Sequence, residues 1–182
     1  RHCEVVLDGK YYGIYILTER PGKGKQRLNL HDPGEDGGDL TGDWRVEIDR
    51  DDEEHYYRSK YHPYGKDGQF NNSYNITYQY DDPEYDDFAD LPEGTEKAIQ
   101  KSIDDMEDCF ASENYKDPTT GYRKYIDVTS FIDYMLSTEF SYNIDGYRLS
   151  SHMYKYSETR AKNEGLDSRW KTTLWDFNIA YG

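Results

Sequence analysis

The hydrophobic period of this 182-residue chain changes once, near Thr95, and that change limits the folds that the chain can adopt. Upstream of Thr95, short β-prone runs are separated by turn-forming residues. The segment 4–19 has two such runs around Asp8-Gly9, and 44–49 and 73–80 alternate between apolar and polar residues. Asp-Gly accepts the positive φ angles of a tight turn, so 4–19 predicts a β-hairpin. Downstream of Thr95, apolar residues recur three or four positions apart, as in amphipathic helices. The sequence therefore predicts an α+β fold.

Two helices and two more strands are predicted downstream of this change. Thr95 and Asp127 are expected to cap the two helices, because their side chains can accept hydrogen bonds from free helical amides. The first helix is expected to bury one stripe, made of Ala98, Ile99, Ile103, Met106 and Phe110. The second is expected to bury Val128, Phe131, Ile132, Met135, Leu136 and Phe140, and to end in the turn-forming SYNIDGY. Strands are predicted at 150–156 and 170–177, with a polar loop between them.

Two stretches upstream of the helices are predicted to be largely irregular. Residues 20–43 are rich in Gly, Pro and Asp, which favours a long exposed loop. The span 50–94 is acidic and tyrosine-rich; its one predicted strand, 73–80, places Tyr74, Ile76, Tyr78 and Tyr80 on one face and precedes an acidic loop at 81–87. We therefore expect a single domain in three parts: 1–49 with the hairpin and a strand, 50–94 as an insert, and 95–182.

Charge and hydropathy exclude two classes of partner. The chain carries 22 basic and 37 acidic residues, a net charge of -15, so it has no basic face for a nucleic acid backbone. No apolar run reaches the length of a membrane span. The 20 tyrosines offset the low aliphatic content, because each ring buries a large apolar area, so we expect a folded protein. Cys3 and Cys109 lack metal-ligand spacing, and their redox state stays open.

Asp145 and Asp176 are the candidates for chemistry. Asp145 lies in the turn after the second helix, and Asp176 is expected at the end of the strand 170–177, so the two can converge. Phosphoryl transfer from a nucleotide uses one carboxylate to orient the attacking hydroxyl and another to hold magnesium. The alternatives are that Asp145 is only a turn residue and that Asp176 forms a salt bridge.

Other charged and polar side chains are interpreted more simply. Arg20, Arg148, Lys155 and Lys171 are expected to be salt-bridge partners rather than phosphate ligands. His31, His55, His62 and His152 lack metal-ligand spacing and are expected to be solvated or hydrogen-bonded.

Four segments, in order, resemble the CotH family of atypical protein kinases: GKYYGIYILTE, DWRVEIDR, YIDVTSFIDYMLSTEFSYNIDGYRLSSHMYK and WKTTLWDFNIAYG. The resemblance covers most of the chain. It implies a divergent protein-kinase-like fold that uses ATP and magnesium to phosphorylate Ser or Thr hydroxyls of protein substrates. It also implies that the phosphate-binding lysine and the first strands lie upstream of Arg1, so the chain is expected to be a fragment.

The resemblance assigns roles to individual residues. Asp145 in NIDGY matches the catalytic-loop aspartate, with Asn143 bracing that loop, and Asp176 in WDFN matches the metal-binding aspartate. Ser150 stands where kinases carry a metal-binding Asn, and Asn178 stands where many relatives carry Asp; both are expected to complete the metal shell. The chain near Leu17 and Glu19 is expected to face adenine.

The sequence is also compatible with two other functions. Because Ser150 and Asn178 depart from the usual ligands, the chain can also be a kinase-like module that binds nucleotide without transferring phosphate. Exposed tyrosines and acidity are also compatible with a secreted structural or carbohydrate-binding module. The resemblance implies an extracytoplasmic location, at the cell surface or secreted.

Overall fold

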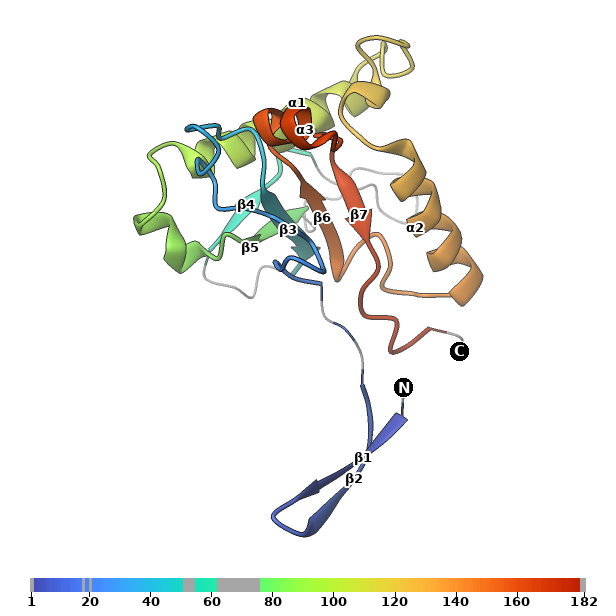
Figure 1. Cartoon of the computed structure of the whole chain (residues 1–182). Helices are drawn as coiled ribbons and strands as arrows, with labels where there is room; N and C mark the ends of the chain where they lie inside the picture. Colours follow the sequence, from blue (N-terminus) through green and yellow to red (C-terminus); the bar gives the residue numbers. More distant parts are fainter. Residues whose placement is uncertain (1, 18, 20, 51–54, 62–75, 181–182) are drawn as a thin grey trace.

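The computed structural model describes residues 2–17, 19, 21–50, 55–61 and 76–180, which form a mixed helix and sheet fold (Figure 1). A five-stranded antiparallel sheet has the order β4-β5-β3-β6-β7, and β1 and β2 form a separate hairpin. The strands are β1 (His2–Leu7), β2 (Lys10–Ile16), β3 (Trp44–Asp49), β4 (Tyr56–Arg58), β5 (Thr77–Asp82), β6 (Ser151–Lys155) and β7 (Lys171–Thr173). The helices are α1 (Thr95–Ala111), α2 (Val128–Ser141) and α3 (Glu158–Glu164), with 3-10 turns η1 (Tyr85–Ala89) and η2 (Tyr122–Lys124). The α+β prediction is confirmed at this level.

The predicted hairpin is present and projects away from the rest of the chain (Figure 1). Asp8 and Gly9 have φ angles of 49° and 75°, the left-handed pair that a tight two-residue hairpin turn requires. Most apolar side chains of β1 and β2, including Val6, Ile14 and Ile16, are exposed. The hairpin is thus formed by its turn and ladder rather than by burial in the core.

The core lies on one face of the five-stranded sheet. Along β3, Trp44 and Val46 are fully buried, and they form a cluster with Ile99 and Ile103 of α1. Side chains alternate between the faces of a strand, so Arg45, Glu47 and Asp49 point to the opposite face. The sheet therefore has an apolar face covered by α1 and a polar face on which three consecutive odd-numbered residues of β3 meet.

Helix α1 follows the prediction except at its two ends. The N-cap is Gly94, with φ of 93°, rather than Thr95, whose hydroxyl instead donates to the carbonyl of Pro92 at 2.8 Å. Phe110 is exposed, because the buried stripe continues from Met106 to Cys109, three positions on.

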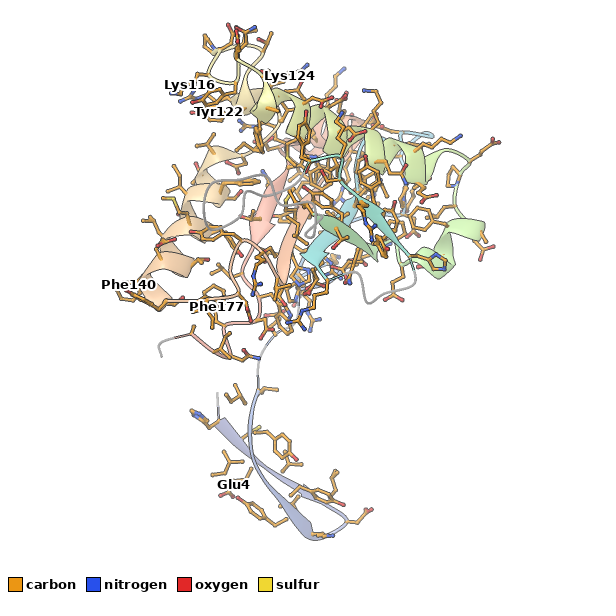
Figure 2. The ribbon with its side chains drawn as sticks, turned by 180° about the vertical axis from the view of Figure 1, so that it is seen from behind. Glu4, Lys116, Tyr122, Lys124, Phe140 and Phe177 are labelled. Atoms are coloured by element: carbon orange, nitrogen blue, oxygen red, sulfur yellow. The ribbon has the colours of Figure 1, made fainter. Side chains whose placement is uncertain are left out.

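Helix α2 begins and ends as predicted, but its predicted buried stripe is wrong. Asp127 caps it by accepting a hydrogen bond from the Thr129 amide at 3.1 Å. The exposed residues include four of the six that were predicted to be buried, Ile132, Met135, Leu136 and Phe140; Phe140 is 82% exposed and lies on the outer side of the helix (Figure 2). The buried side chains are Tyr134, Thr138 and Ser141, with Val128 and Phe131 against the core. The helix is apolar on two sides, so its spacing could not identify the side that meets β7.

Three further predictions are corrected. The strand predicted at 73–80 is β5, which runs from Thr77 through Asp82 into the predicted acidic loop, while Tyr74 lies outside the described residues. The strand predicted at 170–177 is regular only over β7, so Asp176 does not lie on a strand. The polar loop between 156 and 170 contains α3, which Ser157 caps by accepting from the Arg160 amide at 3.4 Å. Local patterns missed β4 and α3, because these elements are only three and seven residues long.

The segment 20–43 is not wholly exposed, because a buried ion pair anchors its end. Asp43 and Arg160 of α3 are both nearly inaccessible and lie 2.7 Å apart. Asp43 also accepts hydrogen bonds from the amides of His31 and Ser157, at 3.3 and 3.1 Å. One carboxylate thus joins this segment to the start of α3.

We expect Asp43→Ala to lower the free energy of unfolding by about 3 kcal/mol, because Arg160 would keep a buried charge without its closest partner. Urea unfolding measures this loss. The matched control is Asp105→Ala, which removes an exposed pair with Lys101 at 2.6 Å and should change the free energy by less than about 0.5 kcal/mol. Equal losses in the two variants would contradict the assigned role of Asp43.

Candidate functional site

The polar face of the sheet carries a row of charged side chains from three adjacent strands. In the β3–β6 register, Glu47 lies opposite His152 and Arg45 lies opposite Tyr154. The β3–β5 register shifts between Arg45 and Val46, which leaves one extra residue, Asp81, on β5. A bulge of this kind re-aims side chains, and here both Asp81 and Asp82 reach Arg45, at 2.7 and 2.6 Å.

The loop after α2 and the segment after β7 meet at one end of this sheet. Because β6 and β7 are antiparallel, the residues that precede β6 lie beside those that follow β7. The hydroxyl of Ser150 lies 3.4 Å from Asp176 Oδ2, and the Asn143 amide nitrogen lies 3.4 Å from the Asp176 carbonyl oxygen. The Asp145 amide in turn donates to Asn143 Oδ1 at 3.4 Å. The structure therefore brings Asn143, Asp145, Ser150 and Asp176 together.

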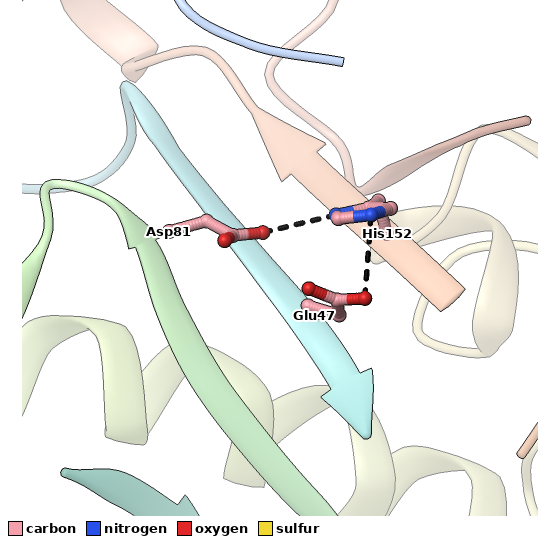
Figure 3. A group of neighbouring side chains, drawn as sticks. All are labelled: Glu47, Asp81 and His152. Carbon is pink, nitrogen blue, oxygen red and sulfur yellow. Dashed lines mark hydrogen bonds and ion pairs between the residues drawn. The ribbon is translucent and has the colours of Figure 1, made fainter. Parts of the chain in front are cut away.

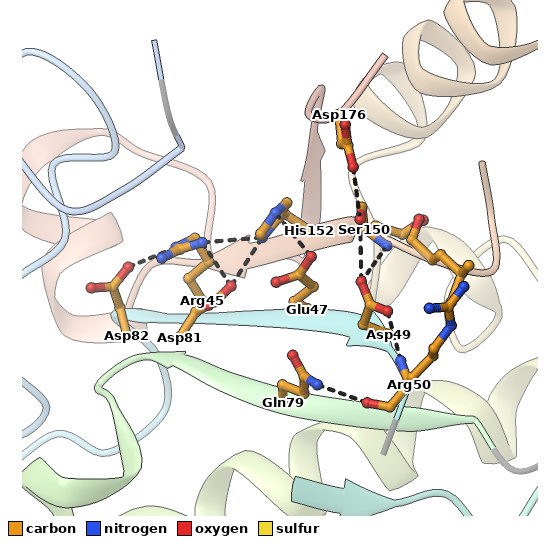
Figure 4. Close-up of polar contacts among 12 residues, drawn as sticks. Arg45, Glu47, Asp49, Arg50, Gln79, Asp81, Asp82, Ser150, His152 and Asp176 are labelled. Carbon is orange, nitrogen blue, oxygen red and sulfur yellow. Dashed lines mark hydrogen bonds and ion pairs between the residues drawn. The ribbon is translucent and has the colours of Figure 1, made fainter. Parts of the chain in front are cut away.

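Asp49, at the end of β3, joins this group. Its Oδ2 accepts from the amide and the hydroxyl of Ser150 at 2.9 and 3.2 Å (Figure 4). Ser150 and Asp176 both have left-handed backbones, with φ of 48° and 51°. Such conformations are unfavourable for residues other than glycine and persist where surrounding contacts enforce them. The contacts from Asn143 and Asp49 supply that enforcement here.

A glycine shapes the loop that carries Asp145. Helix α2 ends at Tyr142, whose φ of 56° turns the chain out of the helix. A Cβ on Gly146 would lie 2.3 Å from Thr138 Cγ2, so only glycine lets the loop pass this close to the helix. Asp145 remains partly accessible, with 34% of its side chain exposed, and lies 3.3 Å from Arg148.

These oxygen atoms form a set that suits a hard divalent cation. Carboxylate and hydroxyl oxygens are the ligands that magnesium prefers, with its remaining positions taken by water or phosphate. Asp176 and Ser150 contribute one such atom each at a separation of 3.4 Å, and Asp49 contributes a second carboxylate beside Ser150.

A second polar cluster lies further along the same face: Glu47, Asp81 and His152 (Figure 3). His152 is 3% exposed, its Nδ1 lies 2.9 Å from Asp81 Oδ2, and its Nε2 lies 3.4 Å from Glu47 Oε1. Burial, followed by the charges of Asp81 and Asp49, raises the pKa of Glu47 to about 8. The sequence interpretation missed this cluster, because its members are 34 and 71 residues apart and only strand pairing unites them.

The sequence profile of the family described as "CotH kinase protein" matches residues 1–182, the whole chain. The chain belongs to the CotH kinase family. No curated protein and no solved structure gave a match. Membership suggests a kinase-like function with nucleotide and metal use.

The CotH resemblance also assigns roles to Leu17, Glu19 and Asn178. In the part of the chain that the structure describes, these three residues do not belong to the hydrogen-bonded group around Asp176. Leu17 is exposed beyond the end of β2. Glu19 pairs with Arg27 at 3.0 Å and lines a hollow of about 280 Å³ together with Thr173 and Leu174, which lead to Asp176. Asn178 is exposed, and within the described ranges no hydrogen bond joins it to Asp176 or Ser150.

Most of the basic residues considered as phosphate contacts in this CotH-family chain have other partners. Arg148 and Lys171 form the predicted salt bridges, with Asp145 at 3.3 Å and Asp127 at 3.1 Å. Lys155 is not a salt-bridge partner of this kind; its amino group lies over the rings of Trp44 and Trp170, 5.7 and 6.0 Å from their centroids. Arg20 lies outside the described residues.

Two sequence expectations concern the chain as a whole. No helix in the described part of the chain is both long and apolar enough to cross a lipid bilayer. Cys3 and Cys109 are free thiols in this structure.

We expect Glu47→Gln to stabilise the protein at alkaline pH. A chelator is added, so that no metal ion can bind to the carboxylate of Glu47 during the measurement. The pKa of Glu47 is 4.5 in the unfolded chain and about 8 when folded, so the folded state loses stability as the pH rises through this window. Glutamine carries no charge to bury and should gain about 2 to 4 kcal/mol near pH 8 and little near pH 5. Urea unfolding at both pH values measures the difference.

The matched control for this experiment is Glu113→Gln, which changes an exposed glutamate and should shift the unfolding free energy by less than about 0.5 kcal/mol at either pH. A Glu47→Gln variant that is less stable than the wild type near pH 8 would contradict the effect of burial assigned to Glu47.

Proposed function

We propose that this protein is an ATP- and magnesium-dependent kinase that phosphorylates Ser or Thr hydroxyls of protein substrates. The observation that carries the proposal is the position of Asn143, which contacts the amide of Asp145 and the carbonyl of Asp176 at 3.4 Å each. The Asn143 side chain thereby holds the backbones of Asp145, the proposed catalytic base, and Asp176, the proposed metal ligand, near each other. Phosphoryl transfer depends mainly on such positioning and on electrostatic stabilisation.

The order of elements around these acids supports a kinase-like arrangement. A helix, α2, leads into the loop with Asp145, an antiparallel strand pair follows, and Asp176 comes directly after it. Protein kinases place a catalytic-loop aspartate and a metal-binding aspartate in this order. The sheet order that surrounds the pair, with β3 beside β6, adds Asp49 to the site.

Each acidic residue has a separate task in the proposed reaction. Asp145 is partly exposed and would accept the proton of the attacking hydroxyl, while Asp176 and Ser150 would hold the cation. Bound magnesium would neutralise the charge on the phosphates of ATP. Asp49 fixes the Ser150 hydroxyl, and Asn143 keeps the loop of Asp145 against the Asp176 backbone.

The hollow beside Leu174 is the proposed place for adenine. It is lined by Glu19, Gln26 and Leu28 on one side and by Thr173 and Leu174 on the other. Leu174 is two residues from Asp176, so a nucleotide bound here would have its phosphates near the proposed metal ligands.

A second candidate is a nucleotide-binding module that does not transfer phosphate. Ser150 favours it, because its hydroxyl contacts Asp49 as well as Asp176 and is a weaker metal ligand than the amide oxygen of Asn at this position. Binding of magnesium and ATP without transfer would identify this module.

We expect Asp176→Ala in the full-length protein to abolish magnesium-dependent ATP binding, because it removes the charged metal ligand. Asp145→Ala should retain binding and lower transfer by about 10²–10⁴-fold, the usual range for loss of a catalytic base. Isothermal titration and a radiolabelled phosphate assay on the same preparations separate the two effects.

Asp105→Ala, an exposed change on α1, is the control for both measurements and should leave binding and transfer unaltered. Transfer at the wild-type rate in either Asp145→Ala or Asp176→Ala would overturn the kinase proposal.

We expect Ser150→Asn to tighten magnesium-dependent ATP binding by about tenfold. Asparagine offers a better ligand oxygen, and it tolerates the left-handed φ of 48° at this position better than most residues do. Ser150→Ala, which removes the hydroxyl, is the matched opposite change and should weaken binding. Equal affinities in the two variants would exclude Ser150 from the metal shell.

A further inference from the structure

The imidazole of His152 has one nitrogen that is buried without a hydrogen-bond partner. Nε2 is shielded from solvent, and no group in the described part of the chain forms a hydrogen bond with it, although Glu47 Oε1 lies 3.4 Å away. Buried polar atoms are nearly always satisfied, and an exception points to a ligand, a water or an ion. This nitrogen faces directly into the cluster of Glu47, Asp81 and His152 (Figure 3).

The other ring nitrogen fixes the tautomer. Asp81 Oδ2 lies 2.9 Å from His152 Nδ1 and also accepts from Arg45 at 2.7 Å. Arg45 Nη1 also lies 3.0 Å from Nδ1, but it already donates to the nearer Asp81 Oδ2. A carboxylate oxygen and an unprotonated nitrogen would repel each other at 2.9 Å, so we assign the proton to Nδ1, which donates it to Asp81. The lone pair of a neutral imidazole is then on Nε2, which faces Glu47. A carboxylate that holds the remote nitrogen of a histidine is the usual support of a metal-binding imidazole.

The spacing between Nε2 and Glu47 is suited to a tetrahedral ion. Two ligands about 2.05 Å from zinc at a tetrahedral angle are about 3.4 Å apart. The observed separation is 3.4 Å. Hydrogen bonds between nitrogen and oxygen are most often about 2.9 to 3.0 Å long, and His152 Nε2 forms none within the described part of the chain.

The charges around the cluster also favour a cation. Arg45 contacts both Asp81 and Asp82, and its single charge offsets only one of these two carboxylates. Glu47 is the further carboxyl group that faces His152, at 3.4 Å. With neutral His152, one negative charge remains on Asp81 and Asp82, and a bound cation would offset it together with the carboxylate of Glu47.

We propose that Glu47 and His152 bind a divalent transition metal ion of the zinc type, and that Asp81 orients the imidazole. Imidazole nitrogen together with carboxylate favours zinc and similar ions over magnesium, which prefers oxygen ligands. This site shares no ligand with the magnesium site proposed at Asp176 and Ser150. It adjoins that site through Asp49, which contacts Ser150.

Metal titration of the full-length protein tests the proposal. The protein is stripped with a chelator and titrated with Zn²⁺ alone by calorimetry, and with Co²⁺, whose visible absorption reports a tetrahedral nitrogen and oxygen environment. We expect one high-affinity equivalent in the wild type and at least a tenfold loss in His152→Gln, which keeps the approximate size of the side chain. His31→Gln is the matched control, because His31 also pairs with an aspartate, at 2.9 Å, but should leave that equivalent intact.

Two variants separate this site from the proposed kinase site. Asp176→Ala should lose magnesium-dependent ATP binding and retain the zinc equivalent, whereas His152→Gln should lose the zinc equivalent. Zinc binding that disappears in Asp176→Ala and persists in His152→Gln would overturn the proposal, as would a wild type that binds no zinc. Circular dichroism checks the fold, and if His152→Gln does not fold, Glu47→Gln takes its place with the same expected loss.

Discussion

The alternation of side chains along β3, which pairs with β5 on one edge and with β6 on the other, is the constraint on which the rest of the structure depends. It sends Trp44 and Val46 into the core against α1 and sends Arg45, Glu47 and Asp49 to the other face. One hexapeptide therefore supplies both the centre of the core and the central charges of both candidate sites. A shift of its register by one residue would exchange the two faces, burying charges among apolar side chains.

Buried charge pairs fix that register more tightly than apolar packing alone can. Arg45 binds Asp81 and Asp82. The bulge at Asp81, near the end of β5, allows the carboxylates of these two consecutive residues to contact the same guanidinium group. Removing one partner of such a pair leaves a charge without compensation, whereas most apolar exchanges lose only part of their burial. The pairing of β3 with β5 is accordingly specific as well as stable.

Sequence reasoning found the features that local chemistry determines. Asp8-Gly9 defines the hairpin, Asp127 starts α2, and the apolar spacing of 98–106 defines α1. It failed where a distant partner decides the result. The buried side of α2 is chosen by β7, and the proximity of Glu47 to His152 depends on strand pairing across more than a hundred residues. Asp145 and Asp176 were both identified as candidates, but Asp49 was not, because nothing near it in sequence marks it as a neighbour of Ser150. The alternation of WRVEID, with every second residue charged, is the signal that could have indicated a buried polar face.

Asp49 gives the two candidate sites a physical connection. Its Oδ2 accepts from Ser150, and its carboxylate shares a hydrogen bond with Glu47. Two carboxylates can share a hydrogen bond only when one of them carries a proton, since two charged groups at that distance repel each other. The two candidate sites share no ligand, yet they are connected from Glu47 to Asp176 through the carboxylate of Asp49 and the hydroxyl of Ser150.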